Sequence, residues 1–274
     1  MNASPLRIAT WNVNGLRARA ERVAAWLDAN APDIVLLQET KCDPTQIPEG
    51  FFASRSYEVA ALGAGGRNGV LIASRLGLRD VHESIADYTP KGHDPELPDL
   101  LSEPRLISAI CGGIRVASVY APNGREVDAP HFHAKLHWYD ALRAWSAARI
   151  SESAPLILGG DFNVAPTDAD VWDPAALVGA THVTPREREA WSALIGLGLT
   201  DAALAVTPVG ERAPFTWWDY RGGAFHRGWG MRIDHLLVEP RAGAILSSSV
   251  DREGRKGASP SDHAALMIEL EPAA

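Results

Sequence analysis

The stretch PLILGGDFNVAPTDAD, residues 155–170, is the part of the chain that says most about its fold. A short apolar run followed by two glycines predicts a buried strand whose end can approach neighbouring backbone closely. In extended backbone the side chains alternate between two faces, so Asp161 and Asn163 share one face. Phe162 and Val164 then point to the other face, toward the core. The stretch therefore predicts a core strand that ends by presenting a carboxylate and a carboxamide together.

Short apolar strands alternate with helical patterns along the rest of the chain. Apolar residues recur with helical spacing at 19–31, 131–150 and 185–198. Further apolar runs predict strands at 6–13, 33–39, 69–74, 105–110, 113–121, 231–239 and 264–270. Gly112 and Gly113 predict a hairpin between two of these strands. No Pro/Ser-rich linker or low-complexity tract divides the sequence, so we expect one α/β domain over residues 1–274, with strands in two layers and helices outside.

The composition allows a large core and argues against several classes of protein. Of the 274 residues, 46% are hydrophobic and 22% are charged, enough for a core that needs no disulfides. No run approaches the ~18 apolar residues of a membrane span, and the first strand begins too early for a secretory signal. Cys42 and Cys111 match no metal or redox spacing, so we expect free thiols in a reducing cytoplasm. The net charge of −8 argues against non-specific coating of nucleic acid but permits a nuclease with a local basic rim.

Polar side chains occur at the ends of the predicted strands or inside them. They are Asn12, Glu39, Tyr120, Asp161, Asn163, Asp234, Asp262 and His263. Each alone has an ordinary explanation, such as turn formation or a satisfied polar contact. As a set they are more informative, because Asp234 lies within an apolar strand and needs a partner, for which a histidine is well suited. The histidine-rich HFHAKLH, residues 131–137, is expected to be a solvated helix face.

Glutamate, aspartate and asparagine oxygens form a hard donor set that suits Mg²⁺ or Mn²⁺, and the absence of a Cys/His ligand pattern argues against zinc. Such a metal, an aspartate that orients water and a charged histidine are the groups that phosphodiester hydrolysis requires. No P-loop and no GxGxxG follows a strand, so the sequence gives little support to nucleotide-cofactor chemistry.

Seven motifs carry a resemblance to a known family. They are TWNVNGLRAR (10–19), LQETK (37–41), VYAPNG (119–124), GDFNVAPTDAD (160–170), FTWWDYR (215–221), RIDHLL (232–237) and SDHA (261–264). In this order they resemble the exonuclease III family of apurinic/apyrimidinic (AP) endonucleases, in the endonuclease/exonuclease/phosphatase superfamily. The GDxN and SDH motifs are shared with DNase I-like nucleases and inositol phosphate phosphatases. NGLRAR, LQETK and WWDYR narrow the resemblance to the repair nucleases.

The resemblance implies a DNase I-like fold, a four-layer α/β sandwich of two packed mixed β-sheets flanked by helices, with the site at one rim. It makes Glu39 the main Mg²⁺ ligand, with Mn²⁺ as a substitute metal. The other implied ligands are Asn12, Asp161, Asn163 and Asp262. The implied catalytic residues are Tyr120, Asp161, Asn163, Asp234 and His263.

The resemblance also implies a role for each catalytic residue. Asp161 would orient or deprotonate the attacking water, and Tyr120 would contact the phosphate. Asn163 would stabilise the pentacovalent transition state. His263, held by Asp234, would face the scissile phosphate. The identity of the general base stays open.

The implied DNA and substrate contacts are Asn123, Lys41, Arg105, Trp217 and Met231. Asn123 would touch the phosphate, and Lys41 and Arg105 would supply positive charge near the site. Trp217 and Met231 match the positions of an apolar pocket for a base-free sugar, which would select abasic sites by excluding a normal nucleotide. Residues 87–104 match no motif.

We therefore expect a Mg²⁺-dependent DNA repair phosphodiesterase that acts as a cytoplasmic monomer, without a membrane, on double-stranded DNA with abasic sites or with blocked or recessed 3′ ends. It would cut 5′ to an abasic site, act as a 3′-phosphatase and 3′-phosphodiesterase, and remove nucleotides in the 3′→5′ direction. Two alternatives stay open. One is a phosphatase for inositol phosphates or phospholipids from the same superfamily, and the other is a catalytically inactive DNA-binding module.

Overall fold

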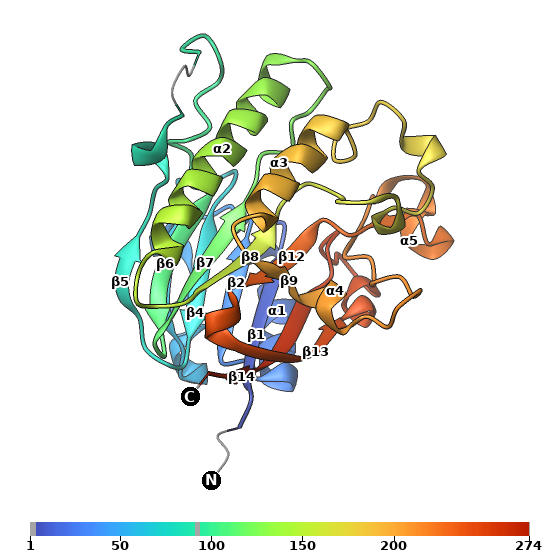
Figure 1. The fold of residues 1–274 in the computed structure, drawn as a ribbon. Coiled ribbons are helices and arrows are strands. Elements are labelled where there is room, and N and C mark those ends of the chain that lie inside the picture. The colour runs from blue at the N-terminus through green and yellow to red at the C-terminus, as the bar shows by residue number, and fades with distance from the viewer. Residues whose placement is uncertain (1–3, 91–93, 274) are drawn as a thin grey trace.

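Two six-stranded β-sheets form the centre of the computed structural model, which describes residues 4–90 and 94–273 (Figure 1). The strand order of the first sheet is β13 (Gly243–Val250), β14 (Leu266–Pro272), β1 (Leu6–Asn12), β2 (Ile34–Gln38), β4 (Val70–Ser74) and β3 (Glu58–Leu62). The order of the second is β5 (Arg79–His82), β6 (Leu106–Cys111), β7 (Ile114–Tyr120), β8 (Leu156–Asp161), β12 (Asp234–Val238) and β9 (Thr200–Asp201). Both sheets are mixed, since β1 and β2 pair in parallel, as do β7 and β8, whereas the outer pairs are antiparallel.

The inner faces of the two sheets share one apolar core. Fully buried Leu36 on β2 and Ile8 on β1 belong to the same cluster as Ile157 on β8 and Leu236 on β12. Burial of this much aliphatic surface between two sheets is the main favourable contribution to folding. The α/β sandwich expected from the sequence is confirmed.

Helices cover the outer faces of both sheets (Figure 1). Helix α1 (Ala20–Asn30) packs Val23 and Leu27 against the first sheet. Helices α2 (Pro130–Ile150) and α3 (Pro185–Ile195) cover the second sheet, where Trp138 and Leu194 join its outer core. These are the three helices that the apolar spacing predicts.

Smaller elements complete the structure. They are helices α4 (Ala202–Val206) and α5 (Ala224–Arg227) and a ribbon of β10 (Trp217–Trp218) and β11 (Gly230–Met231). Within the described residues, no helix combines the length and the apolar character that a membrane crossing requires. Both cysteines are free and buried, as expected.

Of the strands in the two six-stranded sheets, the sequence did not predict β3, β5, β9 and β13, and it also missed the short β10 of the ribbon.

The four missed strands of the large sheets have a common cause. These are the outer members of the two sheets. An edge strand is half-exposed and carries polar residues, so it lacks the apolar run by which the central strands were identified. The hairpin across Gly112 and Gly113 is confirmed, with Cys111 opposite Ile114.

Two strand boundaries differ from expectation near the rim. The strand predicted at 231–239 is interrupted, because β11 ends at Met231 and β12 begins at Asp234. Strand β8 ends at Asp161, and Asn163 adopts a left-handed conformation with φ 51° instead of extended backbone. A sharp turn, not a continuing strand, therefore sets the direction of the Asn163 side chain.

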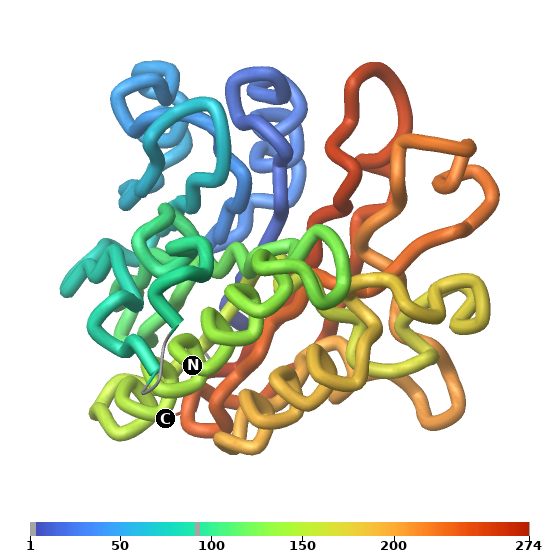
Figure 2. The backbone as a smooth tube through the Cα atoms, turned by 90° about the horizontal axis from the view of Figure 1, so that it is seen from above, coloured from blue at the N-terminus to red at the C-terminus, as the bar shows by residue number. Residues whose placement is uncertain are grey.

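The polar strand ends meet at one end of the sandwich. Tyr120 pairs in register with Asp161, and Asp161 lies opposite Asp234 on the next strand. Seen from above, blue N-terminal, green and yellow middle, and red C-terminal segments all reach this end of the molecule (Figure 2). We call it the rim.

Gly160 allows β7 and β8 to approach each other there. A Cβ atom at Gly160 would lie 1.8 Å from the Val119 carbonyl oxygen, a backbone atom that cannot rotate away. A Cβ atom at Gly159 would instead meet side-chain methyl groups of Leu36 and Leu236, at 2.5 and 2.6 Å.

We predict that Gly160→Ala lowers the free energy of unfolding by at least about 3 kcal/mol, because the strand pair must separate to admit the methyl group. Gly159→Ala is the matched control and should cost about 1–3 kcal/mol, since side chains can repack. Urea unfolding monitored by tryptophan fluorescence measures both. Equal losses in the two variants would contradict the assigned backbone contact.

Candidate active site

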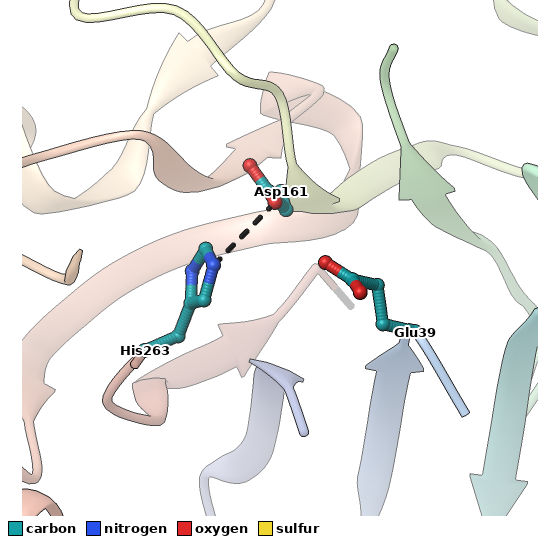
Figure 3. Close-up of side chains that lie close together, drawn as sticks. All are labelled: Glu39, Asp161 and His263. Atoms are coloured by element: carbon teal, nitrogen blue, oxygen red, sulfur yellow. Dashed lines mark ion pairs between the residues drawn. The ribbon is translucent and has the colours of Figure 1, made fainter. Parts of the chain in front are cut away.

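Three side chains from distant parts of the chain converge at the rim (Figure 3). Glu39 follows β2, Asp161 ends β8, and His263 precedes β14, and the three point toward one another. One ligand atom from each lies within 4.8 Å of the other two. The His263 Nε2 to Asp161 Oδ2 distance is 3.7 Å. The strand order places these groups together, as the sequence predicted.

Asn12 links the two carboxylates. Its amide nitrogen donates to Glu39 Oε1 at 2.9 Å and to Asp161 Oδ2 at 3.0 Å, and its Oδ1 accepts from the Asn14 backbone N–H. Lys41 Nζ lies 2.9 Å from Glu39 Oε2. Burial alone would raise the pKa of Glu39, but the bonds from Lys41 and Asn12 outweigh it and lower that pKa. Glu39 is therefore held as an anion at neutral pH.

His263 is oriented by Asp234. Its Nδ1 lies 2.8 Å from Asp234 Oδ2, and both side chains are buried. Burial would lower the pKa of His263, but Asp234 first and then Asp161 outweigh it and raise the pKa to about 10. A charged imidazolium with its Nε2 toward Asp161 is what this geometry favours at neutral pH.

Asp161 differs from Glu39 in its proton affinity. Burial is the main cause that raises its pKa, and the nearby Asp234 and Glu39 raise it further against the opposing effects of His263 and Asn12. The result is a pKa of about 7 in the metal-free chain. The two carboxylates of the site thus have different proton affinities, the usual signature of different roles.

Tyr120 stands beside the carboxylates at the end of β7. Burial, with the nearby Glu39 and Asp161 charges, raises its pKa well above the ordinary value. The hydroxyl is therefore a hydrogen-bond donor near neutral pH. The Arg105 guanidinium carbon lies 4.9 Å from the centre of the Tyr120 ring, and Arg105 Nε bonds to Glu103 at 2.7 Å. Arg105 thus contacts Tyr120 and is largely buried, and its implied contact with DNA stays a prediction.

The backbone at the rim is locally unfavourable. Asn14, Glu39 and Asn163 have φ values of 46°, 48° and 51°, in the left-handed region that non-glycine residues rarely adopt. Such conformations persist where surrounding bonds enforce them, and they concentrate at functional sites. Here they turn the chain sharply after strands β1, β2 and β8.

Two asparagines extend the site on the side of β8 away from His263. Asn163 Nδ2 donates to the Ala121 carbonyl at 2.9 Å, and its Oδ1 lies 3.5 Å from Asn123 Nδ2. Asn123 is exposed and can reach a bound molecule. His182 Nε2 lies 3.3 Å from the same Asn123 nitrogen. Burial and then the Lys135 charge lower the pKa of His182 to about 4, so its ring is neutral.

Asp262 lies beside the site and uses both carboxylate oxygens within the protein. Asn14 Nδ2 donates to one at 2.9 Å, and Trp217 Nε1 donates to the other at 3.1 Å. Burial opposes ionisation, but His263 and these two donors lower its pKa. Asp262 orients Trp217 and Asn14 in this structure.

Trp217 and Met231 face each other across the β10–β11 ribbon, as their paired register shows. Trp217 is half-buried, whereas Met231 is only 6% exposed and packs with Val171 and Ile233.

A polar cavity of about 410 Å³ opens on the other side of the site. Tyr120, Asn123 and three arginines, Arg67, Arg105 and Arg125, contribute to its lining. Asp99 and Glu103 also line it, and Glu103 pairs with Arg67 and Arg105, so the cavity carries only a small excess of positive charge.

The donor set fits a hard divalent cation. Glu39 and Asp161 supply carboxylate oxygens a few ångströms apart, and His263 already bonds Asp234 through Nδ1, so the two carboxylates would hold the ion. Among the described His, Cys, Asp and Glu side chains, Asp262 does not join this group of possible metal ligands, and the amide nitrogen of Asn163 donates to the Ala121 carbonyl. Their implied role as ligands stays a prediction.

Sequence reasoning missed Asn14, His182, Lys135 and Glu187, which all contact residues of the site. Asn14 was detectable, since it lies between Asn12 and the turn glycine Gly15. The others lie on helices or in a loop, outside the pattern of polar strand ends. The expectation of a solvated face at 131–137 is wrong for Lys135, which is fully buried.

Comparison with known proteins extends these observations. The model of the endonuclease/exonuclease/phosphatase family matches residues 9–263. A 3′ phosphatase from Neisseria, solved with a product DNA hairpin, is 39% identical over 97% of this chain and 99% of its own, with a TM-score of 0.87. An AP endonuclease from Archaeoglobus fulgidus is 34% identical with the same coverage and TM-score. Exodeoxyribonuclease III of Haemophilus influenzae is 27% identical over 97% of this chain and 100% of its own.

We predict that Asp234→Asn lowers the pKa of His263 from about 10 toward the ordinary histidine range, because the main stabilising charge is lost. Histidine-edited ¹H–¹⁵N spectra of metal-free protein, recorded from pH 5 to pH 11, measure the ring titration. Exposed histidines in the same spectra are the internal reference. An unchanged His263 titration in the variant would refute the assigned partner.

Proposed function

Because the chain belongs to the exonuclease III and AP endonuclease group of the endonuclease/exonuclease/phosphatase family and is a nuclease that hydrolyses its substrate, we propose that it is a Mg²⁺-dependent DNA repair phosphodiesterase. It would cut 5′ to abasic sites, remove 3′ phosphates and other 3′-blocking groups, and remove nucleotides in the 3′→5′ direction. We further propose that it acts as a cytoplasmic monomer on double-stranded DNA.

The observation that carries this proposal is the Glu39, Asp161 and His263 cluster with Asp234 behind it. A phosphate that enters the cluster meets a histidine cation on one side and an aspartate that can receive a proton on the other. His263 is suited to stabilise the charge that develops on the phosphoryl oxygens, because Asp234 keeps it protonated and fixes its ring. Preorganised charge of this kind costs no reorganisation during the reaction.

Asp161 is suited to position the attacking water. Its pKa is about 7 in the metal-free chain and would be lower beside a bound Mg²⁺, so Asp161 would meet the water as a carboxylate that accepts its hydrogen bond. Tyr120, protonated and beside it, is suited to donate a hydrogen bond to a phosphoryl oxygen. The Asn163 amide would add a donor on the far side, where the charge of a pentacovalent phosphorus would spread. The Asn123 amide lies 3.5 Å from Asn163 Oδ1 and 3.3 Å from His182 Nε2, and it would exchange one of these long contacts for the phosphate. A Mg²⁺ ion held by Glu39 and Asp161 would polarise the phosphoryl oxygen and assist the leaving alkoxide.

The relatives support different parts of the substrate range. The Neisseria relative is described as a 3′ phosphatase and the Archaeoglobus fulgidus relative as an AP endonuclease. Selection of an abasic sugar would depend on Trp217 and Met231. Only a small part of the Met231 side chain is exposed and could contact the sugar. The cavity beside Tyr120, which three arginines help to line, would bind the flanking phosphates.

The alternatives have less support. An inactive binding module does not explain why Glu39, Asp161 and His263 converge at the rim, with Asp234 bonded behind His263. A phosphatase for inositol phosphates would not account for the repair-nuclease names of the relatives aligned over nearly the whole chain.

We predict cleavage of three labelled duplexes, carrying an internal abasic site, a 3′ phosphate and a recessed 3′ end, in Mg²⁺ but not in EDTA. Asp161→Asn and His263→Ala should lower kcat by at least about 100-fold and still bind DNA in a gel-shift assay. A soluble inositol phosphate is the control substrate. Binding of DNA without turnover by the wild type, or faster turnover of the inositol phosphate, would refute the proposal.

We also predict that Glu39→Gln raises the Mg²⁺ concentration for half-maximal rate by at least about tenfold, because the neutral amide is a weaker ligand for a hard cation. Glu21→Gln, on the exposed side of α1, is the matched control and should leave the Mg²⁺ dependence unchanged. A titration of initial rate against Mg²⁺ decides the point. Equal dependence in wild type and Glu39→Gln would place the metal elsewhere.

A further inference from the structure

A buried ion pair lies directly behind the two asparagines of the site. Lys135, on α2, and Glu187, in the first turn of α3, are both fully buried, with Nζ 2.5 Å from Oε1. The pair joins the two helices that cover the second sheet. Packing alone does not require two charges here, because an apolar pair of similar volume would fill the same space without the cost of desolvation.

The three protons of the Lys135 ammonium all have acceptors. One goes to Glu187, one to the Asn163 carbonyl at 2.7 Å, and one to the Asn123 carbonyl at 3.4 Å. Lysine has no other donors, so its whole hydrogen-bonding capacity is used on the counter-ion and on these two rim residues. One cation thus fixes the backbone of both asparagines.

The Asn163 carbonyl needs this help because of its conformation. The left-handed φ of 51° turns the carbonyl into the interior, where an unpaired acceptor is costly. A second donor reaches the same oxygen, since His182 Nδ1 lies 2.6 Å away. The carbonyl cannot donate, so His182 carries its proton on Nδ1 and its Nε2 can accept from the Asn123 amide at 3.3 Å.

Glu187 completes the assembly from the other side. It accepts from the His182 backbone N–H at 2.9 Å and from the Thr184 backbone and hydroxyl at 3.1 and 2.8 Å. The carboxylate therefore holds the loop that carries His182 as well as the lysine. Gly124 packs against the Lys135 side chain, since an added Cβ at Gly124 would lie 3.1 Å from Lys135 Cδ.

We propose that Lys135 is a positioning residue, which holds the amides of Asn163 and Asn123 in place for the substrate through its bonds to their two carbonyls, with Glu187 as its counter-ion. This inference rests on the proposed function, because it assigns the two amides to substrate. Misplacement of reacting or stabilising groups by about 1 Å can cost about 100-fold in rate. The network should therefore influence kcat more than KM.

The test compares two variants of the pair. Lys135→Met/Glu187→Gln removes both bonds to the carbonyls and leaves no unpaired charge. Glu187→Asp keeps the lysine, its counter-charge and its two bonds to the carbonyls. We expect kcat of the double variant to fall by about 10- to 100-fold with KM within about threefold, and kcat of Glu187→Asp to fall by less than about fivefold. Steady-state kinetics use whichever of the three duplexes the wild type cleaves, and Tm is measured for each protein.

An ion pair between a buried arginine and a partly exposed glutamate, remote from the rim, supplies the control. Arg115, at the start of β7, is 1% exposed and bonds Glu152, whereas Tyr120 lies at the other end of the same strand. Arg115→Met/Glu152→Gln should lower Tm and leave kcat unchanged. Such a result separates loss of stability from loss of positioning.

The inference is overturned if the double variant retains wild-type kcat, or if Glu187→Asp loses as much kcat as the double variant. Should the double variant fail to fold, Lys135→Gln/Glu187→Gln takes its place, because the shorter glutamine cannot bridge both carbonyls. The same kcat loss supports the inference, and an unchanged kcat overturns it. A wild type that cleaves none of the duplexes defeats the proposed function instead, so the two failures are distinct.

Discussion

The bond between His263 Nδ1 and Asp234 Oδ2 is the contact on which the site depends. Asp234 is fully buried, and its other carboxylate oxygen has no hydrogen-bond partner among the described residues. Removing one member of such a buried pair costs about 3–5 kcal/mol, because an uncompensated charge remains. The positive charge of His263 therefore compensates the buried Asp234 carboxylate. In the proposed reaction the same charge would stabilise the phosphoryl oxygens.

The sheet architecture explains why this charge stands where a phosphate can use it. Strand β12 runs antiparallel to β8, so the first residue of β12 lies opposite the last residue of β8, and Asp234 meets Asp161. Two carboxylates on adjacent strands repel each other, and the repulsion contributes to the raised pKa of Asp161. His263 comes from the first sheet and lies near both. The packing of one sheet on the other thus brings the cation to the carboxylate pair.

Sequence alone predicted the central strands, the three long helices and most of the site, because buried strands and polar strand ends leave a strong pattern. The edge strands β3, β5, β9 and β13 were missed, since exposed strands need no apolar run. The direction of the Asn163 side chain was predicted from the alternation of side chains in extended backbone. Asn163 lies in a left-handed turn instead, which such alternation does not predict. Lys135 was placed in solvent since helical spacing shows which residues share a face, but not whether a charged one has a buried partner.

The site is consequently held between two buried ion pairs with opposite orientations. At His263 and Asp234 the cation would face the substrate in the proposed mechanism, and the anion lies behind it. At Lys135 and Glu187 the cation lies behind two neutral asparagines and faces their carbonyls, so only amide groups are presented forward. Lys41 already pairs with Glu39, and a further bare cation at the rim would add to the competition with a metal for Glu39 and Asp161. Lys135 instead fixes the positions of two neutral amides, which avoids that competition. An aligned amide donor still stabilises an anion, because it lowers the energy of developing negative charge without carrying charge itself.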